Sequence, residues 1–265
     1  MFRNITPVVQ NLLLINVALY LVSSFILPAL NDWFPLFYFQ SVYFMPFQFL
    51  TYMFMHADFW HLFGNMFGLL VFGPLLEQFL GPKKLLILWM ASGIGAGVLY
   101  AGVNAYEIRS FEEKAIQYEL APDPEVFNRL VLEESGPFQK AGLRDFVDRY
   151  SRNADSEQYI QESVRIINDI SDFNINVTRM LGASGAFFGI LIAFGMLFPN
   201  TQLFLLFPPM PVRAKYLVLF WGLYTVYNVF LNNPDDNVAH FAHLSGLLIG
   251  AILVTFWKKD RNSFY

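Results

Sequence analysis

The sequence predicts an all-α membrane protein with six transmembrane helices and one soluble helical insertion. Three observations indicate this fold class. Hydrophobic residues make up 55% of the 265 residues and charged residues only 14%, which is too apolar for a single soluble domain of this length. Six apolar segments come close to the roughly 20 residues that a helix needs to cross a bilayer. Charge is concentrated in residues 104–178, which hold 15 acidic and 8 basic side chains.

The predicted helices follow one another along the chain as separate apolar runs. They are 11–30, 57–76, 85–103, 180–198, 215–232 and 238–257. The first run has near full spanning length and no small-residue cleavage site, so we expect an uncleaved span rather than a signal peptide. A turn-rich link, 232–237, separates the last two. The run Leu203–Phe207 is too short to cross and leads into prolines, so we expect it at the membrane interface.

The distribution of Lys and Arg predicts the orientation. Cations precede the first span, lie between the second and third and between the fourth and fifth, and follow the sixth: Arg3, Lys83, Lys84, Arg213, Lys215, Lys258, Lys259 and Arg261. In a six-span chain these positions share one side, and positively charged loops stay in the cytoplasm. We therefore expect a multi-pass protein of the bacterial inner membrane with both termini in the cytoplasm.

The same division predicts the domains. Residues 1–103 and 179–258 form one discontinuous transmembrane core, 104–178 form an extracytoplasmic helical insertion between spans three and four, and 259–265 form a cytoplasmic tail. Within the insertion, Asp123-Pro124 is typical of a helix cap followed by proline in the first turn. Apolar residues over 159–170 recur near helical spacing and predict an amphipathic helix.

The loop between the first two spans, 31–51, is rich in aromatic residues and nearly uncharged. Aromatic side chains favour the level of the lipid headgroups. We therefore expect this loop to lie partly embedded in the outer leaflet, in contact with membrane lipids.

Three spans carry polar residues near their outer ends. His61 and Asn65 lie in the second span, Ser184 in the fourth and His243 in the sixth. Polar groups inside a membrane are expensive and usually mark a working site. These spans run in the same direction, and each polar residue lies within roughly 10 Å of its helix end, so the residues should share one depth.

The spacing of these residues suits nucleophilic catalysis. His61 and Asn65 share a helix face, and small residues that permit close helix packing follow Ser184 and His243: Gly185, Gly189, Gly246 and Gly250. A serine and a histidine on separate helices could then come within hydrogen-bond reach as nucleophile and general base. His61 and Asn65 could supply donors to the oxyanion that forms when a carbonyl is attacked.

The motifs Gly182-x-Ser184-Gly185, His61-x-x-x-Asn65 and Ala242-His243-x-x-Gly246 together resemble the rhomboid intramembrane serine proteases. The resemblance covers the six-span body and not the insertion. It implies that Ser184 is the nucleophile, His243 the base, and His61 and Asn65 the oxyanion-hole side chains. It also implies an endopeptidase that cleaves transmembrane protein substrates near the outer membrane surface, without metal or cofactor.

The resemblance extends to some supporting residues and fails at others. It gives His56 a bracing role in the loop and the Glu77-x-x-x-Gly81 element a structural role. The family often has Trp-Arg in the first loop where this chain has Phe47-Gln48, which leaves the anchoring of the loop open. The insertion is unusual, and we hypothesise that it contacts substrates or partner proteins.

Other interpretations remain to be distinguished. His240 competes with His243 as the base, although Gly246 has the family spacing from His243. The main alternative function is a proteolytically inactive rhomboid-like protein that binds client membrane proteins. A metal or haem site could be built from His56, His61, His240 and His243, but the spans carry no HExxH motif.

The sequence argues against three further classes of function. It has no cysteine and therefore no thiolate nucleophile or cysteine-based metal site. It has no basic patch with interleaved aromatic residues, so we expect no nucleic-acid partner. It has no visible inverted repeat, which disfavours a transporter.

Overall fold

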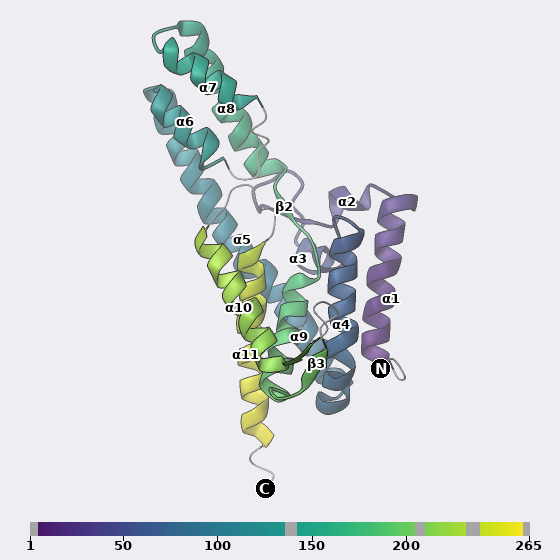
Figure 1. Ribbon diagram of the computed structural model, residues 1–265. Helices are drawn as coiled ribbons and strands as arrows, with labels where there is room; N and C mark the ends of the chain where they lie inside the picture. The colour runs from purple at the N-terminus through teal and green to yellow at the C-terminus, as the bar shows by residue number, and fades with distance from the viewer. Residues whose placement is uncertain (1–4, 136–141, 205–209, 232–238, 262–265) are drawn as a thin grey trace.

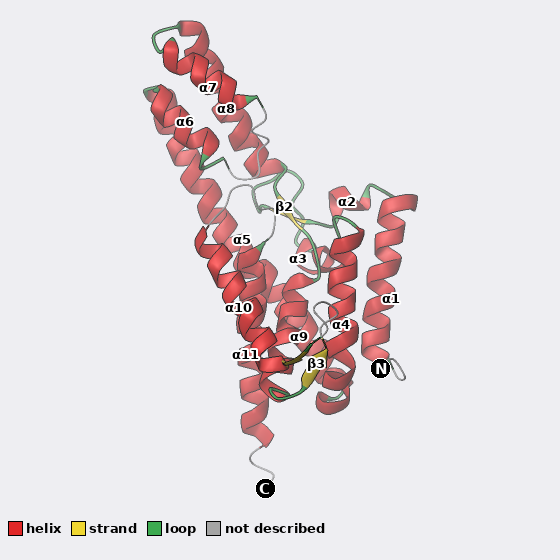
Figure 2. Ribbon diagram, viewed as in Figure 1, coloured by secondary structure: helices red, strands yellow, loops and turns green. Residues whose placement is uncertain are grey.

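The computed structural model describes residues 5–135, 142–204, 210–231 and 239–261. They form a bundle of helices with a helical arm projecting from one end (Figure 1). Helices dominate throughout, and the strands are short (Figure 2). The predicted all-α membrane fold class is confirmed. The structure adds two small two-stranded sheets that were not predicted.

The bundle helices follow the predicted order. They are α1 (Pro7–Leu21, continued by a π-helical turn over Val22–Ile26), α4 (Phe59–Leu80), α5 (Pro82–Leu120), α9 (Ser184–Leu197), α10 (Ala214–Leu231) and α11 (His240–Arg261). The arm contains α6 (Pro124–Leu132), α7 (Leu143–Arg152) and α8 (Glu157–Asn176). The first loop contains α2 (Leu30–Trp33), β1 (Leu36–Phe37), α3 (Gln48–Thr51) and a 3-10 turn over Tyr52–Phe54. The remaining strands are β2 (Arg179–Met180), β3 (Gln202–Phe204) and β4 (Pro211–Arg213).

Helix α9 is shorter than the predicted span 180–198. In the described part of the chain, five helices are long and apolar enough to cross a membrane, and α9, with 14 residues, is not among them. At 1.5 Å per residue it extends about 21 Å. It packs against α4, α5, α10 and α11, so its neighbours rather than lipid surround it. The residues before Ser184 form β2 and a loop instead of the predicted first turns.

Helix α5 is longer than the predicted span 85–103. It continues without a break through residue 104 to Leu120. Its buried side chains keep helical spacing beyond the bilayer-length segment, at Asn104, Ile108, Phe111, Ala115 and Tyr118. Pro122 follows its end. The span therefore becomes the first helix of the arm, and the domain boundary at 103/104 stays a prediction.

The arm has a hydrophobic core of its own. Its buried cluster comes from α5, α6, α7 and α8 and shares no residue with the cluster of the bundle. Asp123 caps α6 by accepting hydrogen bonds from the backbone N–H groups of Glu125 and Val126, which confirms the predicted cap. The predicted amphipathic helix is also confirmed, because Ile167 and Ile170 of α8 are fully buried in this cluster.

Small residues bring α5, α9 and α11 together. A Cβ atom on Gly189 would lie 2.1 Å from Ser92 Oγ of α5, and a Cβ atom on Gly250 would lie 2.8 Å from Gly189 Cα. Neither position could hold a side chain without separating the helices. The predicted role of these glycines in close packing is therefore confirmed, and α9 is held between the other two helices.

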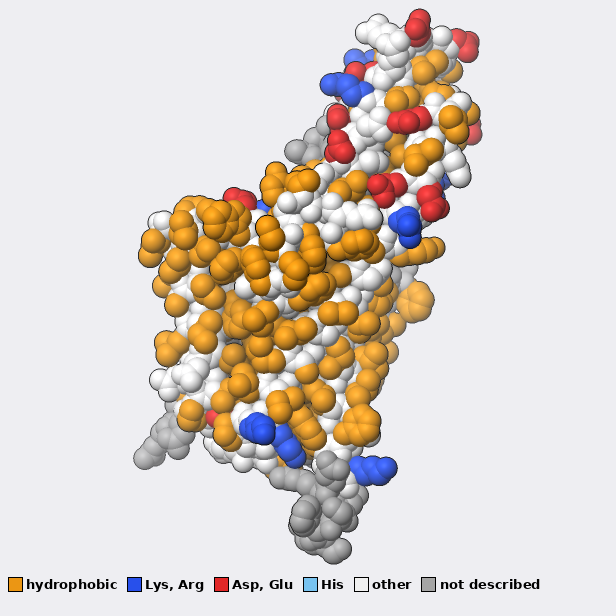
Figure 3. All heavy atoms as spheres, turned by 180° about the vertical axis from the view of Figure 1, so that it is seen from behind, with side chains coloured by type: hydrophobic (Ala, Val, Ile, Leu, Met, Phe, Trp, Pro, Cys, Tyr) orange, Lys and Arg blue, Asp and Glu red, His pale blue; other side chains and the backbone are white. Residues whose placement is uncertain are grey.

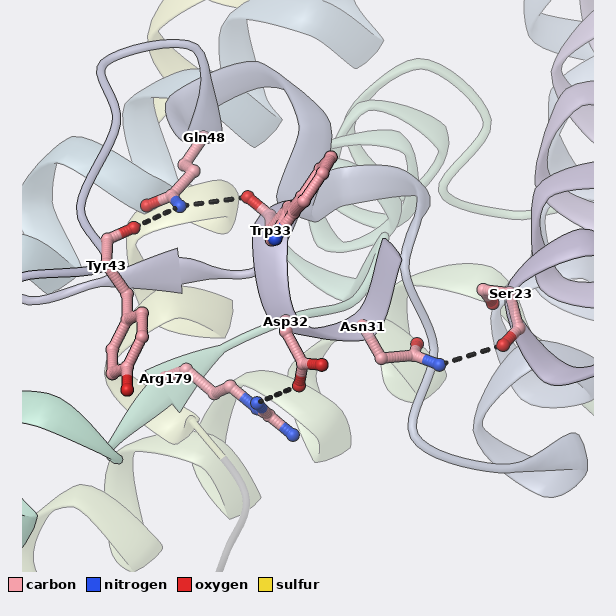
Figure 4. Close-up of polar contacts among 7 residues, drawn as sticks. All are labelled: Ser23, Asn31, Asp32, Trp33, Tyr43, Gln48 and Arg179. Carbon is pink, nitrogen blue, oxygen red and sulfur yellow. Dashed lines mark hydrogen bonds and ion pairs between the residues drawn. The ribbon is translucent and has the colours of Figure 1, made fainter. Parts of the chain in front are cut away.

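The first loop is anchored by Gln48, the second residue of the Phe47-Gln48 pair. The side chain is fully buried, and its Nε2 group donates to the carbonyls of Trp33 and Tyr43, both at 2.9 Å (Figure 4). Its Oε1 atom accepts from the N–H of Phe37 at 3.3 Å. An amide that both donates and accepts thus ties three points of the loop to α3.

The anchored loop is joined to the segment that enters α9. Strand β1 pairs antiparallel with β2, with Leu36 opposite Met180. Arg179 forms an ion pair with Asp32 at 3.5 Å (Figure 4). The loop and the approach to Ser184 therefore form one platform at the end of the bundle from which the arm projects.

The surface divides by polarity along the long axis. Viewed from behind, hydrophobic side chains cover the body of the bundle, whereas charged side chains gather on the arm and Lys and Arg lie at the opposite end (Figure 3). The first turn of α1 and the last turn of α11 also lie at the end away from the arm (Figure 1). The run predicted at the interface, Leu203–Phe207, begins in β3, and its residues 205–207 lie outside the described residues, as does the link 232–237.

Candidate active site

Ser184 is the first residue of α9 and is half-buried. Two residues earlier, Gly182 has φ of 123°, in the region that favours glycine. The Gly182 N–H donates to the Tyr52 carbonyl at 3.0 Å, which fixes the loop. A Cβ atom on Gly182 would lie 2.6 Å from His61 Nε2 and 3.8 Å from Ser184 Oγ. The imidazole and the hydroxyl therefore border the same glycine.

His61 and Asn65 lie on the first two turns of α4. Asp58 caps this helix by accepting from the His61 N–H at 2.9 Å, which places His61 in the first turn. Asn65 is 5% exposed, and no described residue accepts a hydrogen bond from its buried Nδ2 group. Buried amide donors are normally satisfied, so this one is available to an oxygen that is not part of the described protein.

His243 lies in the first turn of α11 and contacts α9 directly. Its ring stacks on Phe188, with ring centroids 4.3 Å apart and planes 6° apart. Phe188 is four residues after Ser184 and shares its face of α9. Three residues after His243, a Cβ atom on Gly246 would lie 2.0 Å from the carbonyl oxygen of Gly185, so the two backbones touch. The structure thus brings His243 to the face of α9 that carries Ser184.

His56 lies beside His61 at the start of α4. The two rings meet edge to face, with centroids 5.1 Å apart. His56 is 3% exposed, and burial, the largest cause, together with the nearby His61 lowers its pKa from 6.5 to about 3. The ring is therefore neutral at neutral pH and packs against His61.

The four histidines form two pairs. His56 contacts His61, and His240 contacts His243 edge to face at 5.9 Å. In the part of the chain that the structure describes, no group of three or more His, Cys, Asp or Glu is arranged to hold a metal ion. Of the second pair, only His243 stacks on the ring that follows Ser184, which favours it over His240 as the base.

Two residues that support the site, Phe188 and Tyr52, are not predicted from the sequence. Phe188 was assigned no role, although its place one turn after Ser184 was a usable signal. Tyr52 binds the loop before α9 through its carbonyl, and its hydroxyl donates to the Gly93 carbonyl of α5 at 2.6 Å. No local pattern marks Tyr52, because both of its partners are distant in the sequence.

Comparison with known proteins gives the family. The Rhomboid domain matches residues 43–109 and 164–259, and the unmatched stretch between them falls in the arm. RHOMBOID-like protein 12, mitochondrial, from Arabidopsis thaliana is 27% identical over 211 residues, which are 80% of this chain and 46% of that protein. The chain thus spans about half the length of this relative. No solved structure matches the chain. Because the family match covers more than half of its residues, this multi-pass membrane protein belongs to the rhomboid family.

Proposed function

We propose that this protein is an intramembrane serine endopeptidase that cleaves transmembrane protein substrates. Rhomboid proteins are generally serine proteases of this kind, and the observation that carries the proposal is the stacking of His243 on Phe188, one helical turn from Ser184. The contact between Gly246 and Gly185 also supports the proposal. It leaves no room for a side chain between α9 and α11, so the helices that carry Ser184 and His243 lie close together.

The proposed reaction is acyl transfer through a serine–histidine dyad. Ser184 Oγ attacks the carbonyl carbon of the substrate peptide while His243 takes the hydroxyl proton and then passes it to the departing amine. Water, deprotonated by His243, next hydrolyses the acyl-enzyme and restores the serine hydroxyl. His61 and the unsatisfied Asn65 amide donate to the oxyanion, together with backbone N–H groups at the start of α9. No cofactor enters this scheme.

Labelling with a serine-directed fluorophosphonate and cleavage of a transmembrane reporter test the proposal. The parent should be labelled and should cleave the reporter, and Ser184→Ala should abolish both. His243→Ala should reduce both by several orders of magnitude, whereas His240→Ala should retain labelling. Asn65→Ala should lower cleavage by about 10²–10³-fold, while Asn228→Ala, whose amide donates to the Tyr224 carbonyl of its own helix, should not.

Two outcomes would contradict the proposal. A folded parent chain that neither reacts with the fluorophosphonate nor cleaves any reporter would support the alternative, a proteolytically inactive protein that binds membrane clients. Retention of labelling in the Ser184→Ala chain would remove Ser184 as the nucleophile.

We also propose that the arm end is extracytoplasmic and that both termini face the cytoplasm of a bacterial cell. The exposed Lys83, Lys258 and Lys259 at the opposite end support this orientation. Because the chain has no cysteine, the labelling of a single introduced cysteine reports the orientation of the protein in the membrane. In intact cells a membrane-impermeant maleimide should label Gln117→Cys on the arm and not Lys83→Cys. The reverse pattern would invert the orientation.

The arm, in this proposal, contacts substrates or partner proteins. It rises from the same end of the bundle as the platform that holds Ser184 (Figure 1). Deleting residues 107–175 should change the cleavage of at least one substrate. Unchanged cleavage of every substrate tested would remove this role.

A further inference from the structure

Five aromatic rings form a closed circuit that includes the candidate base. His243 stacks on Phe188 at 4.3 Å between ring centroids, and Phe188 meets Trp221 edge to face at 6.5 Å. Trp221 meets Tyr224 at 5.7 Å, with planes 88° apart. Tyr224 contacts His240 at 5.9 Å. His240 closes the circuit by its edge-to-face contact with His243, also at 5.9 Å.

Three helices contribute to this circuit. Phe188 comes from α9, the two histidines come from α11, and Trp221 and Tyr224 come from α10. The two α10 residues are 40% and 45% exposed, whereas Phe188 is 6% and His240 is 9% exposed. Helix α10 therefore contacts both ring neighbours of His243 from the outer side of the bundle.

We propose that Trp221 and Tyr224 are positioning residues that hold the His243 ring toward Ser184 by fixing Phe188 and His240. The proposal rests on the proposed function, in which His243 is the base. A proton-transfer group must keep its orientation within narrow limits, and rings that are locked by their neighbours provide this. Stacking fixes the plane of the His243 ring, and the edge-to-face contacts of α10 prevent its two neighbours from rotating.

The decisive comparison is between two tyrosines of α10. Tyr224→Ala should lower kcat for a transmembrane reporter about tenfold, the effect of losing one aromatic contact, and should leave KM within about twofold. Tyr224→Phe should restore the parental kcat because it keeps the ring. The matched control is Tyr227→Ala, the same change at a 61% exposed position one turn further along, which should retain the parental kcat.

Two further measurements separate positioning from loss of folding. Tyr224→Leu retains apolar bulk without the ring, and it should show the lowered kcat at the parental melting temperature. Tyr224→Ala and His240→Ala should be non-additive, because the second change removes a contact that the first has already broken. The effects of Tyr227→Ala and His240→Ala should multiply. A structural role for Tyr224 would lower the melting temperature without this coupling.

The outcomes distinguish this proposal from the one on which it rests. A parent chain without Ser184-dependent cleavage would overturn both. A parent that cleaves through Ser184, with Tyr224→Leu at the same kcat as Tyr227→Ala, would overturn the positioning role alone.

Discussion

At the scale of single residues, Gly182 controls the space between the candidate nucleophile, Ser184, and His61, the candidate oxyanion donor. Its φ of 123° is strained for any other residue, and its missing side chain leaves room for His61. A neighbour placed 2.6 Å from a Cβ atom has to move. Glycine is therefore required at position 182 for two reasons: the backbone has a positive φ, and the His61 ring lies where a side chain would be.

Gly182→Ala should accordingly both destabilise the protein and lower its activity. The strained conformation costs about 1–3 kcal/mol of folding free energy. Displacement of His61 by a fraction of an ångström to one ångström should lower kcat by about 10²-fold. Gly102→Ala is the control, because a Cβ atom there meets nothing within 4 Å. Parental kcat in the Gly182→Ala chain would contradict the geometry of this loop.

His56 gives the protein a predicted dependence of stability on pH. Its pKa falls from 6.5 to about 3 on folding, so the unfolded chain binds a proton below pH 6.5 that the native chain does not. Stability is therefore complete above pH 6.5 and is lost as the pH falls toward 3. At pH 5 the loss from this group is about 2 kcal/mol.

Unfolding of the purified protein at pH 7 and pH 5 measures this loss. His56→Phe keeps a ring against His61 but cannot titrate, so its stability should fall less than that of the parent over the same interval. An equal fall in both chains would show that His56 does not carry the effect.

At the scale of elements, α1 begins where a distant carboxylate caps it. Glu77, near the end of α4, is 4% exposed and accepts hydrogen bonds from the N–H groups of Val8 and Val9, both at 3.0 Å, and from the Thr6 hydroxyl. These N–H groups have no partner within their own helix, and a negative charge suits a helix N-terminus. This contact explains why α1 starts at Pro7 and not at the predicted residue 11.

Glu77→Ala should therefore lower the free energy of unfolding by about 1–3 kcal/mol, since it leaves buried donors unsatisfied. Glu113→Ala, at an exposed position on the arm, should change it by about 0.5 kcal/mol or less. Unfolding by SDS titration in mixed micelles measures both. Equal effects at the two positions would refute the capping role.

At the scale of the whole molecule, α5 joins two separate hydrophobic cores. One lies in the bundle and one in the arm, and no buried residue belongs to both. The arm core is centred on Phe127, which is fully buried and contacts the rings of Phe146 and Tyr150 at 5.5 and 5.7 Å.

The arm should therefore unfold without the bundle. Phe127→Ala should destabilise the arm by about 3–5 kcal/mol and expose it to proteolysis, while fluorophosphonate labelling at Ser184 continues. Leu120→Ala, at an 83% exposed position, should leave the arm resistant. Simultaneous loss of the arm and of labelling would show that the two cores fold as one cooperative unit.

The sequence by itself determined the apolar helices, their order and the positions of the site motifs. These features depend on short-range properties, such as the length of an apolar run, the spacing of residues on one helix and the cap of α6 at Asp123. Such properties depend only on residues that are close together in the sequence.

Only the tertiary structure decided how far the helices extend and which faces meet. The first turn of α1 is capped by the carboxylate of Glu77, which is 68 residues from Val9 in the sequence. Helix α9 is shorter than predicted because the residues before it pair, as β2, with β1 of the first loop. The orientation of His243 likewise depends on Phe188 of another helix. Each of these contacts joins residues far apart in the chain, and no local pattern encodes them.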